Sequence, residues 1–562
     1  MKKKELQLVF IIFILTLFVF SPSLKNEFVN WDDTNVVLAD TSIQRFSWGN
    51  TIDIFKNHFS GHLSRIRPLT YTLYSLEYHY FHLNPLPYHG VGLAIHLLNT
   101  FMVFWIVSHL LQNQRVAFWT ACLFGIHPLH VAPVVWVSAQ MHILYSFFYL
   151  GTIYGYIKWR EIGKRRYLYL SFFMFLLSLL SCTAAMTAPL TLVLIDCYWS
   201  KSFRFHHIYR KWPFFFVSLL FGILTILTTK NFLRSENAFF PIANLPWLDR
   251  LHLTSLSILM YIEKSLWPVG LSCLYPIGYY LPLSNAMLSP LLVFILLFLL
   301  LFQKNSPFLK IVCFGFFLFL IALLPFYQIC NASDSIIDDR YAYFAVLGIF
   351  LILASGLDRL WTLKNDILQP YFKFLMGTYF MILIILTVHR IQVWHNSANL
   401  WTDMIKKYPN IAASYNNRGE YYVRINKINA ALHDLDKAIA LDPNMAFAHF
   451  NKGNALLAKG SIPESIESYS KAISLQPQNT GFLNNRGNAF LLNEEYEQAL
   501  KDYNASLNLN PHQIEAYLNR GMLYTVLRKD EMALKDFQKA LSQDPTNGLA
   551  QSKIKEITER IK

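Results

Sequence analysis

The chain has 562 residues, of which 54% are hydrophobic, 16% aromatic and only 15% charged. Soluble domains carry about 25% charged residues, so this composition excludes a soluble globular enzyme as a description of the whole chain. The formal net charge is +14, and basic topology signals beside a membrane account for it without nucleic acid. We therefore expect the lipid bilayer, and no nucleic acid, as a partner.

Apolar stretches long enough to cross a bilayer recur over residues 1–390. They predict about eleven spans, at 6–22, 90–111, 115–133, 142–158, 167–184, 186–199, 213–229, 287–303, 309–328, 341–358 and 371–390. The more mixed segment 251–266 is predicted to be an interfacial or re-entrant helix. Residues 1–390 are thus expected to form a polytopic membrane domain.

The basic loops predict the orientation of these spans. Lysine and arginine are concentrated in residues 1–4, 159–166 and 201–211, which share one side of the membrane if the spans hold. The positive-inside rule makes that side cytoplasmic, and we interpret the first span as an uncleaved anchor. With eleven spans, the large loop at 23–88 and everything after residue 390 then lie on the outer side.

The outer loop at 23–88 contains two adjacent acids, Asp32 and Asp33, shortly after the first span. Neighbouring carboxylates repel one another and raise one pKa, which suits a general base or a divalent-cation ligand. The alternative is an Asx turn or a helix cap, and the dipeptide alone favours it.

Arg67 follows in the same loop, before Pro68 and a run of tyrosines. An arginine near the interface can hold a phosphate through forked hydrogen bonds, and aromatic faces suit sugars and lipid. Alternatively, these residues are headgroup anchors and an aromatic belt. Further along, His127 and His130 lack a matched third ligand, which favours hydrogen-bonded structure over a metal site.

A third polar group, Asp338-Asp339-Arg340-Tyr341, is placed on the outer side between two spans. Acids beside an arginine at a helix start are usually a dipole and ion-pair device, and that interpretation stays open here.

The carboxyl-terminal third repeats every 34 residues. The period is set by Pro409, Pro443, Pro477, Pro511 and Pro545 and by Gly419, Gly453, Gly487 and Gly521. It is typical of tetratricopeptide repeats, pairs of antiparallel helices in which glycine allows close approach and proline ends the second helix. We predict a half repeat at 391–411, four repeats at 412–547 and a capping helix at 548–562.

One phase of the repeats, two residues before each glycine, is occupied by Asn417, Asn451, Asn485 and Asn519. It lies on the first helix of each pair, whose exposed side lines the concave surface. A ladder of amides can bind a peptide backbone as both donor and acceptor. The alternative is a structural role in capping neighbouring loops. The basic residues that follow each asparagine predict a preference for acidic segments; they are Arg418, Lys452, Arg486 and Arg520.

The motifs occur in a fixed order: 28–33, Arg67–Thr70, Asn84–His89, His127–His130, Trp267–Pro268, Tyr275–Pro276, Asp339–Tyr341 and Trp394–Trp401. Together with the spans and the repeats, this order resembles the transmembrane and tetratricopeptide repeat-containing proteins and their bacterial relatives, over essentially the whole chain. The resemblance implies an all-α protein with the GT-C fold of glycosyltransferases followed by a tetratricopeptide solenoid. Animal members of that family are implicated in O-mannosylation of extracellular protein domains from a dolichyl-phosphate sugar.

What the resemblance implies here is an integral transferase. It would move mannose or a similar hexose from a polyprenyl-phosphate donor to a hydroxyl of a protein held by the repeats. By resemblance, Asp32 or Asp33 is the base. The implied phosphate-binding residues are Arg67, Arg340 and Lys264, supported by the acidic loop residues Asp338, Asp339 and Tyr341. This chemistry requires no metal or other cofactor, although a divalent cation is compatible with the paired acids.

The chain also departs from the bacterial relatives. Ala132 and the run Ala139-Gln140-Met141-His142 stand where those relatives carry acidic or charged residues, and Cys182 replaces part of a Lys-Pro motif. A second hypothesis is therefore a catalytically degenerate membrane anchor whose repeats act as a scaffold for protein–protein interaction. For either function we expect a bacterial inner membrane with periplasmic repeats, or an endoplasmic reticulum membrane with lumenal repeats.

Overall fold

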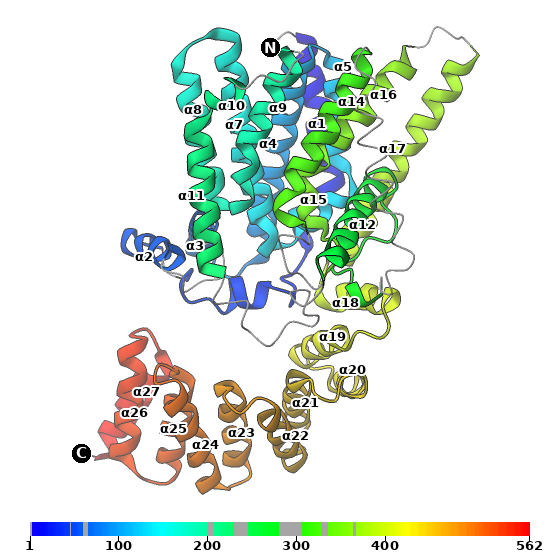
Figure 1. Cartoon of the computed structure of the whole chain (residues 1–562). Coiled ribbons are helices and arrows are strands. Elements are labelled where there is room, and N and C mark those ends of the chain that lie inside the picture. The colour runs from blue at the N-terminus through cyan, green and yellow to red at the C-terminus, as the bar shows by residue number, and fades with distance from the viewer. Residues whose placement is uncertain are drawn as a thin grey trace. The chain divides into compact units, whose positions relative to one another are not determined.

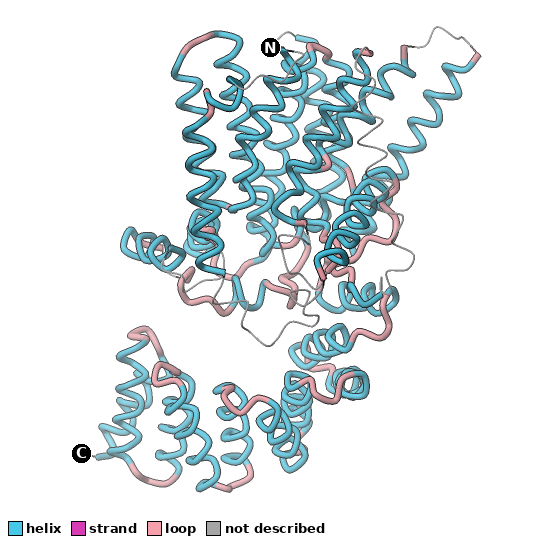
Figure 2. The backbone as a smooth tube through the Cα atoms, in the orientation of Figure 1, coloured by secondary structure: helices cyan, strands magenta, loops and turns pink. Residues whose placement is uncertain are grey.

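The computed structural model describes residues 3–44, 46–59, 66–200, 206–229, 246–279, 306–327, 335–362 and 367–561. Helices and turns make up this part of the chain, together with one isolated antiparallel bridge between Pro276 and Ser335 (Figure 1, Figure 2). The contacts divide the chain into two compact units, Met1–Leu400 and Trp401–Lys562. The all-α prediction is confirmed for the described residues.

The first unit is a bundle of long helices, several of which run side by side (Figure 1). Its α-helices are α1 (Lys3–Phe20), α2 (Trp48–Phe59), α3 (Pro68–Phe81), α4 (Pro85–Leu111), α5 (Gln114–Ile126), α6 (Val131–Val135), α7 (Gln140–Ile162), α8 (Arg165–Ser181), α9 (Ala188–Ser200), α10 (His206–Tyr209), α11 (Trp212–Thr229), α12 (Trp247–Leu266), α14 (Pro307–Leu323), α15 (Asp339–Ala345), α16 (Leu347–Trp361) and α17 (Leu368–Val393).

Four helices in the described residues are long and apolar enough to cross a membrane: α1, α4, α14 and α17. Two bent pairs, α5 with α6 and α15 with α16, bring the number to six if each pair is one span. The chain is therefore a multi-pass membrane protein. Helices also occupy the predicted spans at 142–158, 167–184, 186–199 and 213–229. The predicted span at 287–303 lies outside the described residues, and the total of eleven stays a prediction.

Within this unit, the amino end of α1 and the turn between α7 and α8 lie at the same end of the bundle, opposite α2 and α3 (Figure 1). That turn contains the basic run at 159–166. The amino end of α1 and this basic run therefore share one end of the bundle, while α2 and α3 lie at the other.

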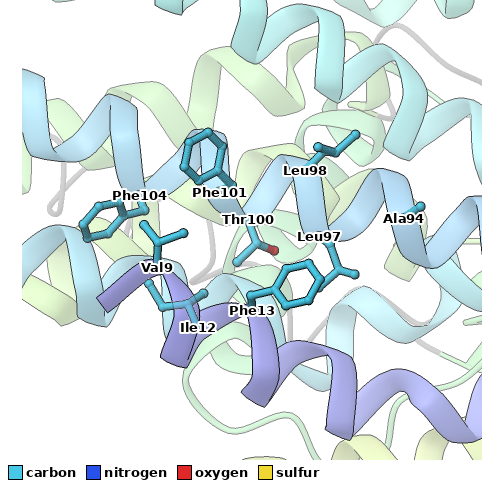
Figure 3. Close-up of a pocket in the computed structure, with 9 residues that line it drawn as sticks. All are labelled: Val9, Ile12, Phe13, Ala94, Leu97, Leu98, Thr100, Phe101 and Phe104. Carbon is cyan, nitrogen blue, oxygen red and sulfur yellow. The ribbon is translucent and has the colours of Figure 1, made fainter. Parts of the chain in front are cut away.

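Some helices of the bundle pack with almost no side chain between them. A Cβ added to Gly348 of α16 would lie 2.0 Å from the backbone oxygen of Gly315 of α14. A side chain at either position would therefore push these helices apart. Other helices pack less closely: α1 and α4 leave an apolar cavity of 410 Å³ between them, lined by residues such as Ile12, Phe101 and Phe104 (Figure 3). Its hydrocarbon lining fits a surface that faces lipid.

The first outer loop is fastened to the chain that leaves α17. The Asn26 side-chain amide donates a hydrogen bond to the backbone oxygen of Trp394 at 3.1 Å. The Asn30 backbone N–H donates to Ser397 Oγ at 2.9 Å. These hydrogen bonds join segments more than 360 residues apart in the sequence, and both segments belong to the first compact unit, Met1–Leu400.

The second unit is the predicted solenoid. Its helix pairs follow α18 (Ser397–Lys407) and are α19 (Ala412–Arg424) with α20 (Ile428–Leu441), α21 (Ala446–Lys459) with α22 (Ile462–Leu475), α23 (Thr480–Leu492) with α24 (Tyr496–Leu509), and α25 (Ile514–Val526) with α26 (Asp530–Gln543), before the final α27 (Gly548–Ile561). A Cβ at Gly487 would lie 2.7 Å from the Tyr503 ring. The glycine column therefore does allow the paired helices to approach closely.

Candidate functional site

The segment between α6 and α7 collects side chains from the motifs that the sequence singled out. Its first connection is to Asp33. The N–H and the hydroxyl of Ser138 both donate to Asp33 Oδ1, at 2.9 and 2.5 Å, and the N–H of Val29 donates to Oδ2 at 3.0 Å. Asp33 is 1% exposed. Both its oxygens are used to hold the loop against this segment, as an Asx-type structural role requires.

Burial raises the pKa of Asp33 to about 6, and the hydrogen bonds from Ser138 and Val29 oppose that rise. The charge of Asp32 contributes least among these causes. The raised pKa expected for one of the adjacent acids thus belongs to Asp33, and its main cause is loss of water rather than repulsion.

Asp32 is placed differently, because its side chain is 47% exposed. Its Oδ2 lies 3.5 Å from Nη1 of Arg340, although the two residues are 308 positions apart in the sequence. A carboxylate that solvent reaches and a guanidinium therefore lie next to each other at this end of the bundle. Of the two predicted bases, only Asp32 leaves an oxygen open to an incoming hydroxyl.

Arg340 is fixed from two further sides. Its Nε lies 2.7 Å from Asp338 Oδ2, and its guanidinium carbon lies 4.6 Å from the centre of the Trp136 ring. Asp338 also caps α15, because its carboxylate accepts a hydrogen bond from the Arg340 N–H at 3.1 Å. The side chain of Arg340 is 14% exposed.

Three tryptophans continue from Arg340 into the bundle. The Trp136 ring stacks on Trp394 at 5.4 Å and on Trp31 at 6.5 Å between centroids. Trp136 and Trp394 are each 1% exposed. The stacked rings connect Trp31, the neighbour of Asp32, to Trp136, which lies against Arg340. They give Asp32 and Arg340 a rigid support.

A second acid, Asp339, points into the bundle. Its carboxylate accepts a hydrogen bond from the Tyr275 hydroxyl at 2.8 Å and lies 3.6 Å from Nη2 of Arg390 on α17. Asp339 and Arg390 are 2% and 4% exposed. This pair holds the start of α15 to the end of α17, which is a structural role for Asp339.

Arg67 lies at the start of α3 and is half-buried. Its guanidinium donates to Met141 Sδ at 3.2 Å and to the Tyr71 hydroxyl at 3.4 Å, and it lies over the Tyr71 ring. Within the described ranges no carboxylate pairs with it. Its charge is therefore available to an anion. Met141 is the second residue of α7, three positions after Ser138, so Arg67 contacts the start of the helix that follows the segment bound by Asp33.

Glu77 of α3 is a buried acid that the sequence did not single out. It is 2% exposed, and its Oε1 accepts from the Gln140 amide at 3.4 Å. Its Oε2 has no hydrogen-bond partner among the residues that the structure describes. Burial raises the pKa of Glu77 well above its ordinary value of 4.5, while the Gln140 hydrogen bond opposes the rise. The folded protein therefore binds this proton more tightly than the unfolded chain does.

This proton predicts a pH-dependent stability. Glu77 contributes stability that is complete below about pH 4.5 and is lost as the pH rises toward the pKa of the folded state. The loss is about 1.4 kcal/mol per pH unit. We expect Glu77→Gln to be more stable than wild type at pH 8 and equal to it near pH 4.5, in thermal unfolding of detergent-solubilised protein. Asp33 titrates in both proteins, so the difference isolates Glu77. Equal stabilities at pH 8 would contradict the burial of a protonated acid.

Lys264 and Tyr341 are the remaining predicted residues of the membrane unit. Lys264 donates to Glu263 at 3.0 Å and to the Val269 carbonyl at 2.9 Å. Its helix, α12, reaches the acidic loop through Tyr261, whose hydroxyl donates to the Asp338 carbonyl. The Tyr341 ring stacks on the Phe326 ring, with 4.2 Å between the ring centroids. The structure thus places Asp32, Arg340 and Asp338 in contact, whereas Lys264 has partners of its own.

The two histidines of the His-Pro-Leu-His motif are buried in the bend between α5 and α6. The His127 ring accepts a hydrogen bond from the Leu129 N–H at 3.3 Å, and Nδ1 of His130 lies 2.6 Å from the Phe124 carbonyl. They are hydrogen-bonded structure, as the sequence favoured. No group of three or more histidine, cysteine or acidic side chains that could hold a metal occurs in the part of the chain that the structure describes.

In the solenoid, the asparagine column joins successive repeats. The amide nitrogens of Asn451 and Asn519 donate to Asn416 and Asn484 of the preceding repeats, at 2.9 and 3.1 Å. The amide of Asn485 donates in the same way, to Asn454. In the described residues, no group donates a hydrogen bond to the side-chain carbonyl oxygens of Asn451, Asn485 and Asn519. Asn417 differs, because its carbonyl oxygen accepts from Asn416. The column therefore combines a structural role with a row of acceptors.

The arginines that follow the asparagines are engaged inside the solenoid. Arg486 binds both carboxylate oxygens of Asp502, at 2.7 and 2.8 Å. The same fork recurs between Arg418 and Asp434 and between Arg520 and Asp536, while Lys452 pairs with Asp436. These pairs neutralise the charges that the sequence had assigned to acidic segments of a partner.

Family models identify the repeats directly. Two tetratricopeptide repeat models match residues 412–445 and 514–547, and a further repeat model matches 453–494 and 487–525. The chain thus contains tetratricopeptide repeats from 412 to 547.

Curated relatives carry the names of enzymes. The chain is 30% identical over 118 residues to mouse protein O-mannosyl-transferase TMTC3, which covers 21% of this chain and 12% of that protein. It is 28% identical to protein O-mannosyl-transferase F38B6.6 of Caenorhabditis elegans, over 22% of this chain and 18% of the relative. Human protein O-mannosyl-transferase TMTC1 is 28% identical, over 24% and 16%. The chain therefore spans less than a fifth of the length of these relatives.

Solved structures match between a quarter and a third of the chain. The tetratricopeptide protein YrrB is 24% identical and covers 29% of this chain and 84% of its own, with a TM-score of 0.26. MamA is 24% identical over 26% of this chain and 86% of its own, with a TM-score of 0.25.

Proposed function

We propose that the chain is an integral-membrane glycosyltransferase that moves a hexose, mannose or a similar sugar, from a polyprenyl-phosphate donor to a hydroxyl of a protein. The observation that carries the proposal is the contact between exposed Asp32 and Arg340, at 3.5 Å, on one end of the membrane unit. A base and a phosphate-binding cation are the two groups that this transfer needs side by side. The names of the curated relatives support the same reaction class.

The proposed reaction is a single displacement. The acceptor oxygen attacks the anomeric carbon of the donor sugar, and the bond from that carbon to the phosphate oxygen breaks. The acceptor proton passes to Asp32, and the polyprenyl phosphate leaves with the bonding electrons. Because attack and departure occur on opposite faces of the sugar, the anomeric configuration inverts.

The cations have separate tasks in this scheme. Arg340, held by Asp338 and Trp136, would take the leaving phosphate. Arg67, which no described carboxylate neutralises, would take the donor phosphate from the side of Met141. Lys264 would serve as a third cation only after leaving Glu263 and the Val269 carbonyl.

The positions that depart from the bacterial relatives still contact the site. Gln140 bridges Glu77 and the Tyr88 carbonyl, and Met141 contacts Arg67. Neutral side chains thus fill these positions in a connected network. This supports a working site with fewer charges.

The acceptor protein would bind to the repeats. The carbonyl oxygens of the asparagine column suit the backbone N–H groups of an extended peptide. Such an acceptor is reached on the outer side, in the periplasm of a bacterium or in the lumen of the endoplasmic reticulum.

A donor panel tests this function. Membranes containing wild type, Arg340→Gln or Arg67→Gln at equal abundance are given labelled polyprenyl-phosphate sugars, and label on proteins is measured. We expect transfer by wild type, and for each variant a donor KM raised roughly tenfold or more, because each loses a charge-assisted contact worth about 1.5–3 kcal/mol. Lys158→Gln, at the opposite end of α7, is a matched charge control and should behave as wild type.

Absence of transfer from every donor would reject the enzyme. The result would favour the second candidate, a membrane-anchored scaffold, for which the repeats from 412 to 547 are the supporting observation.

A further inference from the structure

The last repeat carries a pocket that the asparagine column does not include. It has a volume of 680 Å³ and lies between α25 and α26, where Tyr517, Arg520 and Tyr524 face Lys535, Asp536 and Lys539. The charges around it are not balanced. Arg520 is committed to Asp536 through two hydrogen bonds, at 2.7 and 2.8 Å, and that leaves two lysines.

Lys535 and Lys539 are both exposed, and neither has a carboxylate partner in the described residues. They lie four positions apart on α26, so their ammonium groups share one face of the helix, about 6 Å apart along its axis. The pocket therefore presents two available positive charges at one helix-turn spacing.

Lysines at both of these positions occur in one of the four repeats. The phase of Lys535 is occupied by His433, Glu467 and Lys501 in the other repeats, and the phase of Lys539 by Lys437, Lys471 and Ala505. Only the fourth repeat has lysine in both phases, beside two tyrosines. The arginine–aspartate fork is common to three repeats and is structural, whereas the lysine pair is particular to this pocket.

We propose that this pocket binds an acidic peptide segment, with two carboxylates of the segment on Lys535 and Lys539 and its backbone against the Tyr517 and Tyr524 rings. Aromatic rings with polar tips suit a peptide, because they combine contact area with hydrogen bonding. This site is separate from the asparagine column and does not depend on the proposed transferase activity.

Binding is measured with full-length protein in nanodiscs of neutral lipid and a short fluorescent peptide of Asp, Glu and Gly. Lys535→Gln/Lys539→Gln should weaken binding about five- to thirtyfold, as expected for two partly exposed charge pairs, and wild-type binding should weaken with added salt. Lys437→Gln/Lys471→Gln removes the same charge from other repeats and should bind as wild type.

Three results would overturn the proposal. The first is equal affinity of the Lys535/Lys539 variant and wild type. The second is equal weakening by the Lys437/Lys471 variant, which would show a general charge effect. The third is displacement of the peptide by glycerol phosphate at concentrations where free aspartate has no effect, which would identify the pocket as a phospholipid headgroup site.

Discussion

Asp32→Asn is expected to lower the rate of sugar transfer by about 10²- to 10⁴-fold, the usual contribution of a general base. The amide keeps the size of the side chain and cannot accept the acceptor proton. Because Asp32 is 47% exposed, its loss should leave thermal stability almost unchanged. Initial rates at saturating donor, normalised to folded protein, measure the effect.

Asp33→Asn provides the contrast within the same dipeptide. An amide nitrogen at one carboxylate position would face a backbone or side-chain donor of Val29 or Ser138. We expect a loss of about 1–3 kcal/mol of stability, with the transfer rate per folded molecule retained. Asp53→Asn, an exposed acid on α2, is the charge control. If transfer per folded molecule falls with Asp33→Asn but not with Asp32→Asn, the assignment of the base is wrong.

The second large effect is expected from Arg390→Met. The substitution leaves the Asp339 carboxylate buried without the cation 3.6 Å away. Removal of one partner of a buried pair typically costs about 3–5 kcal/mol. Denaturant unfolding in mild detergent, followed by tryptophan fluorescence, should report this loss. The double variant Arg390→Met/Asp339→Asn should recover part of it, because no uncompensated charge remains.

An exposed ion pair gives the matched control for this experiment. Arg115 pairs with Asp358 at 2.7 Å, but the arginine side chain is 57% exposed. Arg115→Met should therefore cost no more than about 1 kcal/mol. A cost for Arg390→Met as small as that of Arg115→Met would show that the buried pair does not fasten α15 to α17.

Periodic features of the sequence predicted the fold well. The 34-residue phase located the repeats because each repeat must present the same glycine and the same large residue to its partner helix, as Gly487 and Tyr503 do. The length of the apolar stretches located the helices of the membrane unit. Like the pattern within each repeat, apolar length is a local signal. Contacts between distant segments carry no such period.

The candidate site was predicted only in part. The order of the motifs pointed to Asp32 and Arg340. The sequence could not tell the role of Asp32 from that of Asp33, because the two acids differ in burial, which appears only in the structure. Ser138, Trp136 and Arg390 were missed, since an uncharged loop and a cation at the end of a span have ordinary explanations. An intramembrane arginine is costly, and that cost was the available signal for Arg390.

The hydrogen bonds that join Asn26 to Trp394 and Asn30 to Ser397 bear on the timing of biosynthesis. A ribosome makes the Asp32 loop early, yet Trp394 and Ser397, two of its hydrogen-bond partners, emerge only after all the predicted membrane helices. The two contacts that join the acidic loop to the end of α17 therefore form only after α17 has been made. Nascent chains stopped before residue 390 should therefore show this loop as protease-sensitive, and the site would be assembled only when synthesis reaches the repeats.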